Sequence, residues 1–190
     1  MLAKLGLSPD SAILLLGCTL FGSLINLRIF TINSSFEKMP ENYFLPRALL
    51  KPLPFIKGKT IIALNVGGAL IPISFSLYLI TIHSIDFLHL ITAIIFVTFI
   101  SYSFSRPVKG LGIGIPVFIA PISAALSALM LSPENSAPLA YICGTLGVLI
   151  GADLLRLKDI KQMGVPTASI GGAGTFDGIF FTGIIAVLLA

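Results

Sequence analysis

Charged residues are scarce in this chain. Only 11% of its 190 residues are Asp, Glu, Lys or Arg, while 56% are hydrophobic; average soluble chains carry about 25% charged residues. A soluble fold needs a charged exterior, so this composition excludes an ordinary water-soluble globular protein. The apolar residues also come in runs of about 18 or more, the length that crosses a hydrocarbon core of about 30 Å as a helix. We therefore expect lipid to surround this chain.

Cysteine and histidine are scarce as well, with two residues of each. Cys18 and Cys143 lie inside apolar runs, where a thiol behaves as a small hydrophobe, so we expect no disulfide framework and no metal cluster. His83 and His89 flank Asp86 at spacings of three residues, which permits a metal site but fits an interfacial polar cluster better. The chain has no P-loop, no Rossmann glycine pattern after a strand and no Ser/His/Asp set. We therefore expect no cofactor, no nucleotide, no nucleic acid and no soluble ligand.

The apolar runs predict an all-α fold, a polytopic membrane helix bundle that forms one transmembrane domain over residues 1–190. The expected transmembrane helices are about Ser11–Phe30, Thr60–Ile82, Leu88–Phe104, Ile113–Leu131, Pro138–Leu155 and Ile170–Ala190. The second and fifth run in opposite directions, and Gly68–Pro72 in the second resembles Gly147–Gly151 in the fifth. An inverted repeat of two three-helix halves with interrupted helices is a hypothesis for this fold.

Positive residues fall on alternate connections between these helices. Eleven of the twelve Lys and Arg residues occupy the first, third and fifth connections, and only Lys4 lies on the other side. Because cytoplasmic loops of membrane proteins carry the excess of Lys and Arg, we expect both termini outside the cell membrane. Residues 36–59 mix prolines with basic and apolar residues, which predicts a cytoplasmic interfacial loop beside anionic headgroups. Membrane lipids are the expected partners.

Two carboxylates, Asp153 and Asp177, lie inside the predicted spans. An ionised Asp at membrane depth costs at least about 2.5–3.5 kcal/mol, so such residues are rare and usually functional. Their helices are joined by about fourteen residues, and both carboxylates belong to the cytoplasmic half. We expect them to meet and to share one proton, because two carboxylates in contact do not easily both ionise. An alternative for Asp153 is a pair with Arg156 at the interface.

Small residues surround these carboxylates. Gly171, Gly172 and Gly174 precede the second aspartate and lack side chains that would keep another backbone away. They either permit close helix packing or let a substrate chain or a water-filled cleft reach the carboxylates. Asn65 and Pro72 belong to another interrupted helix of the kind that surrounds midplane binding sites. These five residues are the predicted substrate contacts.

Three motifs together resemble an uncharacterised family of multi-pass prokaryotic membrane proteins, over most of the chain from the second span onward. They are Asn65-Val66-Gly67-Gly68 with Pro72, Gly151-Ala152-Asp153, and the run from Ser169 to Gly178. This family resemblance implies a membrane protein and no particular activity.

The paired aspartates are also similar, more remotely, to those of the GxGD intramembrane aspartyl proteases, which include presenilin, signal peptide peptidase and prepilin peptidase. The resemblance implies that Asp177 with Gly174 takes the place of the glycine-motif aspartate and Asp153 that of its partner, both facing a hydrated cavity. The chain departs from the pattern because Gly-Thr-Phe precedes Asp177 and no Pro-Ala-Leu tripeptide follows.

The predicted function is hydrolysis of a peptide bond in a membrane-embedded substrate. One ionised Asp takes a proton from water while the protonated Asp polarises the scissile carbonyl, and the roles exchange as the amine leaves. The alternative is a proton- or cation-coupled transporter that uses the same carboxylates in interrupted helices. A non-catalytic assembly or lipid-binding protein is the third hypothesis.

Overall fold

The computed structural model describes residues 2–33, 58–108, 112–163, 165–172 and 178–190. Helices dominate this part of the chain: α1 (Pro9–Gly22), α2 (Ile71–Ile82), α3 (Phe87–Phe104), α4 (Ile119–Leu131), α5 (Ser136–Val148), the short α6 (Ile160–Met163) and α7 (Gly178–Leu189). The π-helical turns η2 (Val66–Leu70) and η4 (Leu149–Leu154) precede α2 and follow α5. Two 3-10 turns complete the helical elements: η1 (Leu2–Leu5) and η3 (Pro133–Asn135).

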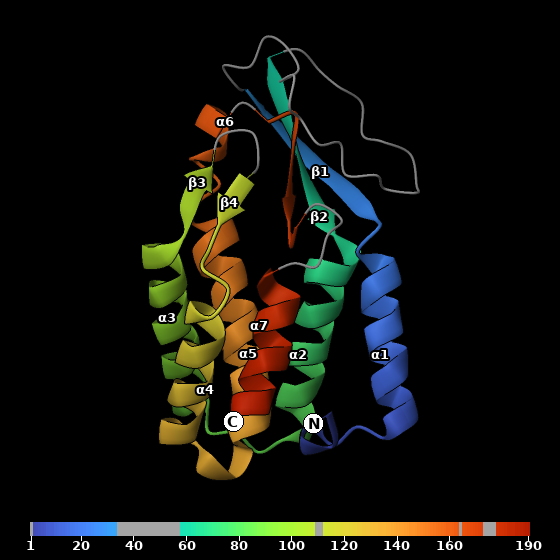
Figure 1. Cartoon of the computed structure of the whole chain (residues 1–190), viewed down its shortest axis with the longest axis vertical. Helices are drawn as coiled ribbons and strands as arrows, with labels where there is room; N and C mark the ends of the chain where they lie inside the picture. The colour runs from blue at the N-terminus through green and yellow to red at the C-terminus, as the bar shows by residue number, and fades with distance from the viewer. Residues whose placement is uncertain (1, 34–57, 109–111, 164, 173–177) are drawn as a thin grey trace.

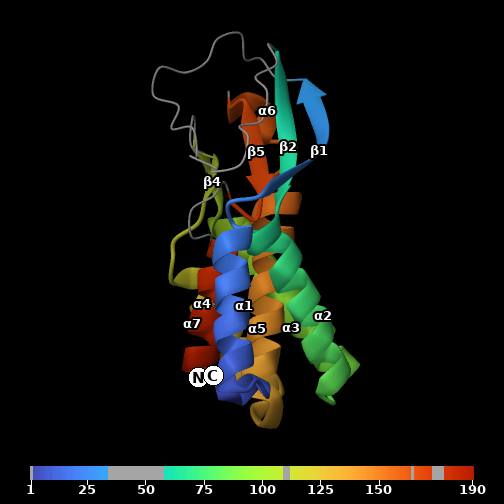
Figure 2. The same cartoon turned by 90° about the vertical axis from the view of Figure 1, so that its right-hand side faces the viewer.

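The long helices run side by side as a bundle, and the two chain termini lie at the same end of it (Figures 1 and 2). Strands occupy the opposite end, which we call the sheet end. There β1 (Asn26–Asn33), β2 (Lys59–Asn65) and β5 (Thr167–Ile170) form a sheet in the order β1-β2-β5. β1 is antiparallel to β2, and β5 is parallel to it. A hairpin of β3 (Arg106–Val108) and β4 (Gly112–Gly114) connects α3 to α4.

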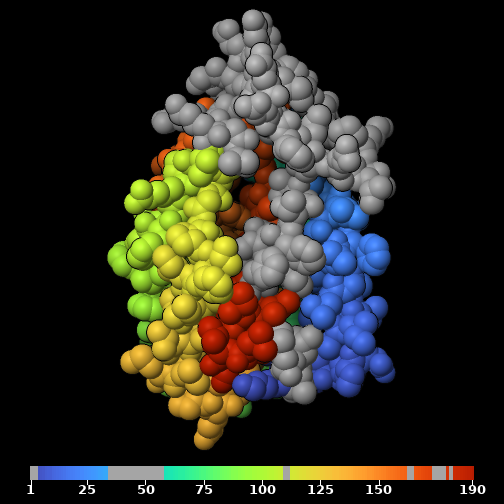
Figure 3. All heavy atoms as spheres, in the orientation of Figure 1, coloured from blue at the N-terminus to red at the C-terminus, as the bar shows by residue number. Residues whose placement is uncertain are grey.

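The outer surface of the bundle is apolar. Phe87–Phe104 and Pro133–Leu154 are long and apolar enough to cross a membrane, and α1, α4 and Val66–Ile82 are apolar but shorter. Only 22% of α3 is buried inside the molecule, and most of its Phe, Leu and Ile side chains, from Phe87 to Phe104, are exposed. α3 and α4 form one flank of the molecule in Figure 3, next to α7.

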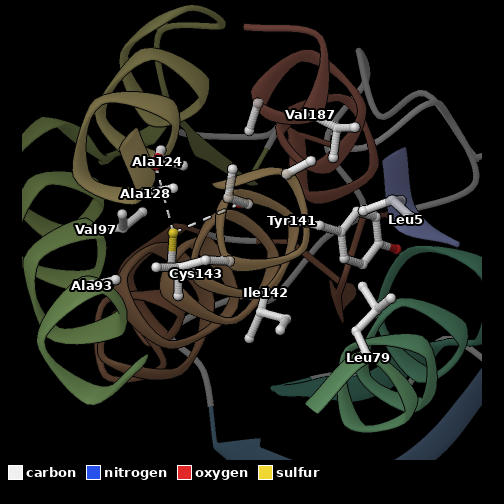
Figure 4. Packing of buried hydrophobic residues seen from close by; sticks show 14 of the residues in the cluster. Leu5, Leu79, Ala93, Val97, Ala124, Ala128, Tyr141, Ile142, Cys143 and Val187 are labelled. Carbon is white, nitrogen blue, oxygen red and sulfur yellow. Dashed lines mark hydrogen bonds between the residues drawn. The ribbon is translucent and has the colours of Figure 1, made fainter. Parts of the chain in front are cut away.

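α5 forms the core of the bundle. All of its residues except Leu146 are buried, and it packs against α2, α3, α4 and α7. Figure 4 shows Tyr141, Ile142 and Cys143 of α5 surrounded by side chains from these neighbours. The ring of Tyr141 meets Phe75 of α2 edge to face, with centroids 5.0 Å apart, an arrangement that aromatic rings prefer. Small residues on α4, such as Ala124 and Ala128, let α5 approach closely.

The expectation of an all-α fold is wrong at the sheet end. The first expected span ends in β1, the second begins with β2, the fourth begins with β4, and the sixth begins at the last residue of β5. An apolar run does not by itself distinguish a strand from a helix, and β-branched and aromatic residues favour the strand. The structure confirms a mostly helical fold with two helices of spanning length among the described residues. The described residues do not form a clear bundle of six spans, and the inverted repeat stays a prediction.

The two ends of the molecule differ in charge. The elements at the sheet end and the turn after η4 carry Arg28, Lys59, Arg106, Arg156, Lys158 and Lys161, whereas Lys4 lies in η1 beside the termini. Most of the interfacial loop predicted at 36–59 lies outside the described residues. Which end faces the cytoplasm stays a prediction.

Candidate functional site at the junction of strands and helices

Asn65 holds together the point where strands become helices. It is 1% exposed, and its Oδ1 accepts a hydrogen bond from the backbone N–H of Gly68 at 2.7 Å, which caps η2. Its Nδ2 donates to the carbonyl of Ser23 after α1 and to Oδ1 of Asn26 at the start of β1. Ser169 of β5 donates to that same Asn26 oxygen at 2.5 Å. Asn65 therefore joins three strands to α1 and α2, and its predicted contact with a substrate is untested.

Glycines allow the backbones to touch at this junction. A Cβ on Gly68 would lie 1.8 Å from the carbonyl oxygen of Gly171, and a Cβ on Gly67 would lie 2.0 Å from that of Thr19. Gly171 and Gly172 both have positive φ angles, 81° and 87°, a conformation that glycine adopts most readily. The end of β5 is thus in backbone contact with η2. Close packing against η2 explains why residue 171 is a glycine. The substrate contacts predicted for Gly171 and Gly172 stay predictions.

Asp153 reaches the same point from the other side. It lies in η4, is half-buried, and its Oδ2 accepts a hydrogen bond from the backbone N–H of Gly171 at 2.8 Å. A wide turn, in which the N–H of Leu155 donates to the carbonyl of Ile150, shapes this segment. Gly151 presses η4 against α3, since a Cβ there would lie 2.5 Å from the carbonyl oxygen of Thr98. The structure therefore connects Asp153 directly to the glycine motif that precedes the second aspartate.

Asp177 and Gly174 lie outside the described residues. Their expected positions, and the expected meeting of Asp177 with Asp153, therefore stay predictions. The residues that follow them are placed: α7 begins at the next residue after Asp177, and Ile179 is buried in one cluster with Ala152, the neighbour of Asp153. Gly171 therefore has a direct contact with Asp153, and Ile179 belongs to the same hydrophobic cluster as Ala152.

Arg156 locks the end of α3 to the chain after η4. Its Nη1 lies 3.1 Å from Oδ2 of Asp159, its Nε donates to Oγ of Ser105, and its Nη2 donates to the carbonyls of Tyr102 and Ser105 at 2.9 Å. The guanidinium also lies 4.3 Å from the centre of the Tyr102 ring, a cation–π distance. A pair between Arg156 and Asp153 was the alternative prediction; the salt bridge that the described residues form is between Arg156 and Asp159. The spacing of three residues between Arg156 and Asp159 was the available signal.

The polar residues between α2 and α3 act as a helix cap. Oδ1 of Asp86 accepts hydrogen bonds from the N–H groups of Leu88 and His89, which is the N-cap arrangement. Within the described ranges, no three His, Cys, Asp or Glu residues are grouped so that they could hold a metal ion. Pro72 is buried at the start of α2, directly after the π-helical turn η2; its predicted binding role is untested.

No curated protein and no solved structure is significantly similar to this chain. A family model described as "Protein of unknown function (DUF1614)" matches residues 20–189. That range includes the whole junction, with Asn65, Asp153 and the glycine motif. The chain therefore belongs to the DUF1614 family.

Proposed function

We propose that this protein is an integral membrane aspartyl hydrolase that cleaves a peptide bond of a membrane-embedded substrate, with Asp153 and Asp177 as the catalytic pair. The observation that carries the proposal is the hydrogen bond from Gly171 to Asp153. It joins Asp153 to the residue at which the glycine motif begins, and Ile179, two residues after Asp177, belongs to the same hydrophobic cluster as Ala152.

The membrane location is supported by the exposed apolar side chains. Phe87, Leu88 and Phe99 of α3 are 75%, 71% and 64% exposed, and Met130 of α4 is 83% exposed. A monomer in water rarely presents so large a continuous apolar surface, because each large apolar side chain gains about 1.5–3 kcal/mol when it leaves water. In a membrane, lipid tails would cover the apolar surface of the helices, and anionic headgroups would lie beside the basic residues of the sheet end. The positive-inside rule then places the sheet end in the cytoplasm.

The proposed chemistry uses the position of Asp153 at the sheet end of the bundle, where η4 leaves the apolar core. Water from the cytoplasmic side enters there without crossing the hydrocarbon region. Ile179 belongs to the same hydrophobic cluster as Ala152. Asp177 precedes Ile179 by two residues, so at most about 7 Å of chain separates the two. A carboxylate pair in contact holds one proton, so one Asp acts as general base towards water and the other as general acid towards the carbonyl.

An extended substrate has a place to bind beside this pair. Within the described ranges β5 pairs only with β2, so its other edge offers unpaired backbone groups to an added strand. β5 leads directly into Gly171 and the catalytic motif. A peptide bond in a helix is shielded by its own hydrogen bonds, and strand addition at this edge would hold the unwound segment next to the carboxylates.

Ion-coupled transport is the second candidate, supported by the two π-helical interruptions at η2 and η4. Discontinuous helices with an intramembrane carboxylate also form the binding sites of transporters.

Single replacements of each aspartate test the proposal in purified protein reconstituted with a single-span test peptide. Asp153→Asn keeps an oxygen that can accept from Gly171 and removes only the ionisable group, and Asp177→Asn does the same for its partner. We expect each change to abolish cleavage and leave thermal unfolding within about 1 kcal/mol of wild type, because neither carboxylate serves as both acid and base. Asp159→Asn is the control that retains cleavage.

Intact cleavage in both single variants would remove the aspartyl mechanism. If the wild-type protein cleaves nothing, while gradient-driven flux disappears in the two variants, the transport function replaces hydrolysis.

A further inference from the structure

An apolar groove of about 610 Å³ lies between α3 and α4, and Asp153 is not among its lining residues. Its lining residues are Thr92, Phe96, Ile100, Phe104, Phe118, Ile119, Ile122, Ser123, Leu126, Ser127, Met130 and Leu131. The two serine hydroxyls donate to carbonyls of their own helix, those of Ala120 and Ala124, both at 2.9 Å. The groove therefore offers its occupant almost only hydrocarbon contact.

The length of the groove selects the kind of occupant. On α4 it runs from Phe118 to Leu131, roughly 20 Å at 1.5 Å per residue. A transmembrane helix of a partner protein needs about 30 Å of apolar contact, whereas a lipid acyl chain covers one leaflet, about 15 Å. An acyl chain fits this groove, and a full spanning helix would extend beyond it.

The charges at the two ends of the groove select the headgroup. Arg106 is exposed and lies two residues after the groove residue Phe104, roughly 7 Å along the strand. The nearby Arg156 already pairs with Asp159, and none of the acidic residues that the structure describes pairs with Arg106. At the other end Glu134 follows Leu131 by three residues. An anionic headgroup is attracted at the sheet end and repelled at the end that carries the termini.

We propose that the α3–α4 groove is a binding site for a phospholipid with an anionic headgroup, with one acyl chain between the helices and the headgroup phosphate at Arg106. The site rests on the membrane location and is independent of the aspartate chemistry. It gives the protein a lipid requirement that its exposed surface elsewhere does not impose.

Brominated lipids test this site, because the chain contains no Trp and single Trp residues can report on each position. Phe96→Trp places the probe in the groove, and Phe99→Trp places a matched probe on the same helix, outside the groove and exposed to lipid. Each variant is reconstituted in vesicles of phosphatidylcholine and phosphatidylglycerol, with one or the other brominated, and Trp quenching gives the relative affinity of the two lipids.

We expect about a fivefold preference for phosphatidylglycerol at Phe96→Trp, from one basic residue near the surface, and almost none at Phe99→Trp. Arg106→Gln should abolish the preference in the groove and leave the quenching of Phe99→Trp unchanged, which also shows that the variant is folded. An equal preference at both positions, or one that survives Arg106→Gln, overturns the site. Absence of quenching at Phe96→Trp alone means that protein, such as a second copy of the chain, fills the groove, which also overturns it.

Absence of quenching at both positions would mean that these helices are not in contact with lipid. That result would overturn the membrane location as well as the lipid site, whereas loss of hydrolysis alone would leave the lipid site standing.

Discussion

Replacing Gly68 by Ala tests the tightest of the glycine contacts among the described residues. The new Cβ would lie 1.8 Å from the carbonyl oxygen of Gly171, whereas ordinary contact begins near 3.4 Å. The atoms it meets belong to backbone, so no side chain can rotate away. The end of β5 must therefore separate from η2 by about 1.6 Å, the difference between these two distances.

The magnitude follows from what that separation breaks. Overpacking a close contact costs about 1–3 kcal/mol. The hydrogen bond from Gly171 to Asp153 has a length of 2.8 Å, and a displacement of this size takes it beyond hydrogen-bonding distance. A hydrogen bond to a charged group contributes about 1.5–3 kcal/mol. We therefore expect Gly68→Ala to lower the free energy of unfolding by about 2.5–6 kcal/mol and to abolish activity.

Gly17→Ala is the matched control, since Gly17 lies in α1 and a Cβ there meets no atom within 4 Å. In a helix Ala is favoured over Gly by about 1 kcal/mol, so this variant should be as stable as wild type or more stable. Unfolding in detergent with increasing denaturant measures both variants. Combining Gly68→Ala with Asp153→Ala should cost less than the sum of the single changes, because both break one contact. Wild-type stability in Gly68→Ala, or strict additivity in the pair, refutes this account of the junction.

Three further predictions concern the remaining contacts and the orientation. Arg156→Gln should lower the free energy of unfolding by about 1–3 kcal/mol, and Arg156→Lys should restore less than half of that loss, because an ammonium does not reproduce the fork of guanidinium donors; full stability of the Lys variant would contradict this. Asn65→Asp keeps the cap of η2 and loses both Nδ2 donors, so thermal unfolding should show it to be less stable than wild type; a stability equal to wild type would show that the donors contribute nothing. Topology reporters fused after Ala190 should lie outside the cell and reporters inserted within 36–59 inside; a cytoplasmic C-terminus would contradict the predicted orientation.

The long helices of the bundle were predictable because their sequences fit only a helix in lipid. The predicted Leu88–Phe104 became α3 at Phe87–Phe104, and Pro138–Leu155 corresponds to α5 with η4. Both are long apolar runs bounded by polar residues, which in lipid fold as helices because every backbone group must be bonded internally.

The sheet end was not predictable by the same reasoning. Most of β2 is buried as the central strand of its sheet, and a strand buried on both faces appears in the sequence as a continuous apolar run, like a helix. Its pairing with β5 joins residues about a hundred positions apart, such as Ile61 and Thr167. No local pattern contains that information, although the β-branched residues at 60–62 were a signal for a strand.

The candidate site was predictable in part, since a carboxylate in an apolar run stands out by its energetic cost. The contact between Asp153 and Gly171 was not, because it depends on where β5 ends. Asn65 was identified as part of an interrupted helix, but its place as the cap that joins α1 to the sheet follows only from the three-dimensional arrangement.

The two π-helical turns, η2 and η4, have similar sequences, but only η4 contains a carboxylate. Val66–Leu70 reads Val-Gly-Gly-Ala-Leu, and the last five residues of η4 read Ile-Gly-Ala-Asp-Leu. Each turn has a glycine where another backbone crosses. A Cβ on Gly67 would lie 2.0 Å from the carbonyl oxygen of Thr19, and a Cβ on Gly151 would lie 2.5 Å from that of Thr98. The residue aligned with Asp153 is Ala69, which is fully buried. A wide turn at this end of the bundle therefore forms without a carboxylate, so the turn itself does not require Asp153, and the proposed chemistry supplies a reason to keep a carboxylate near the membrane.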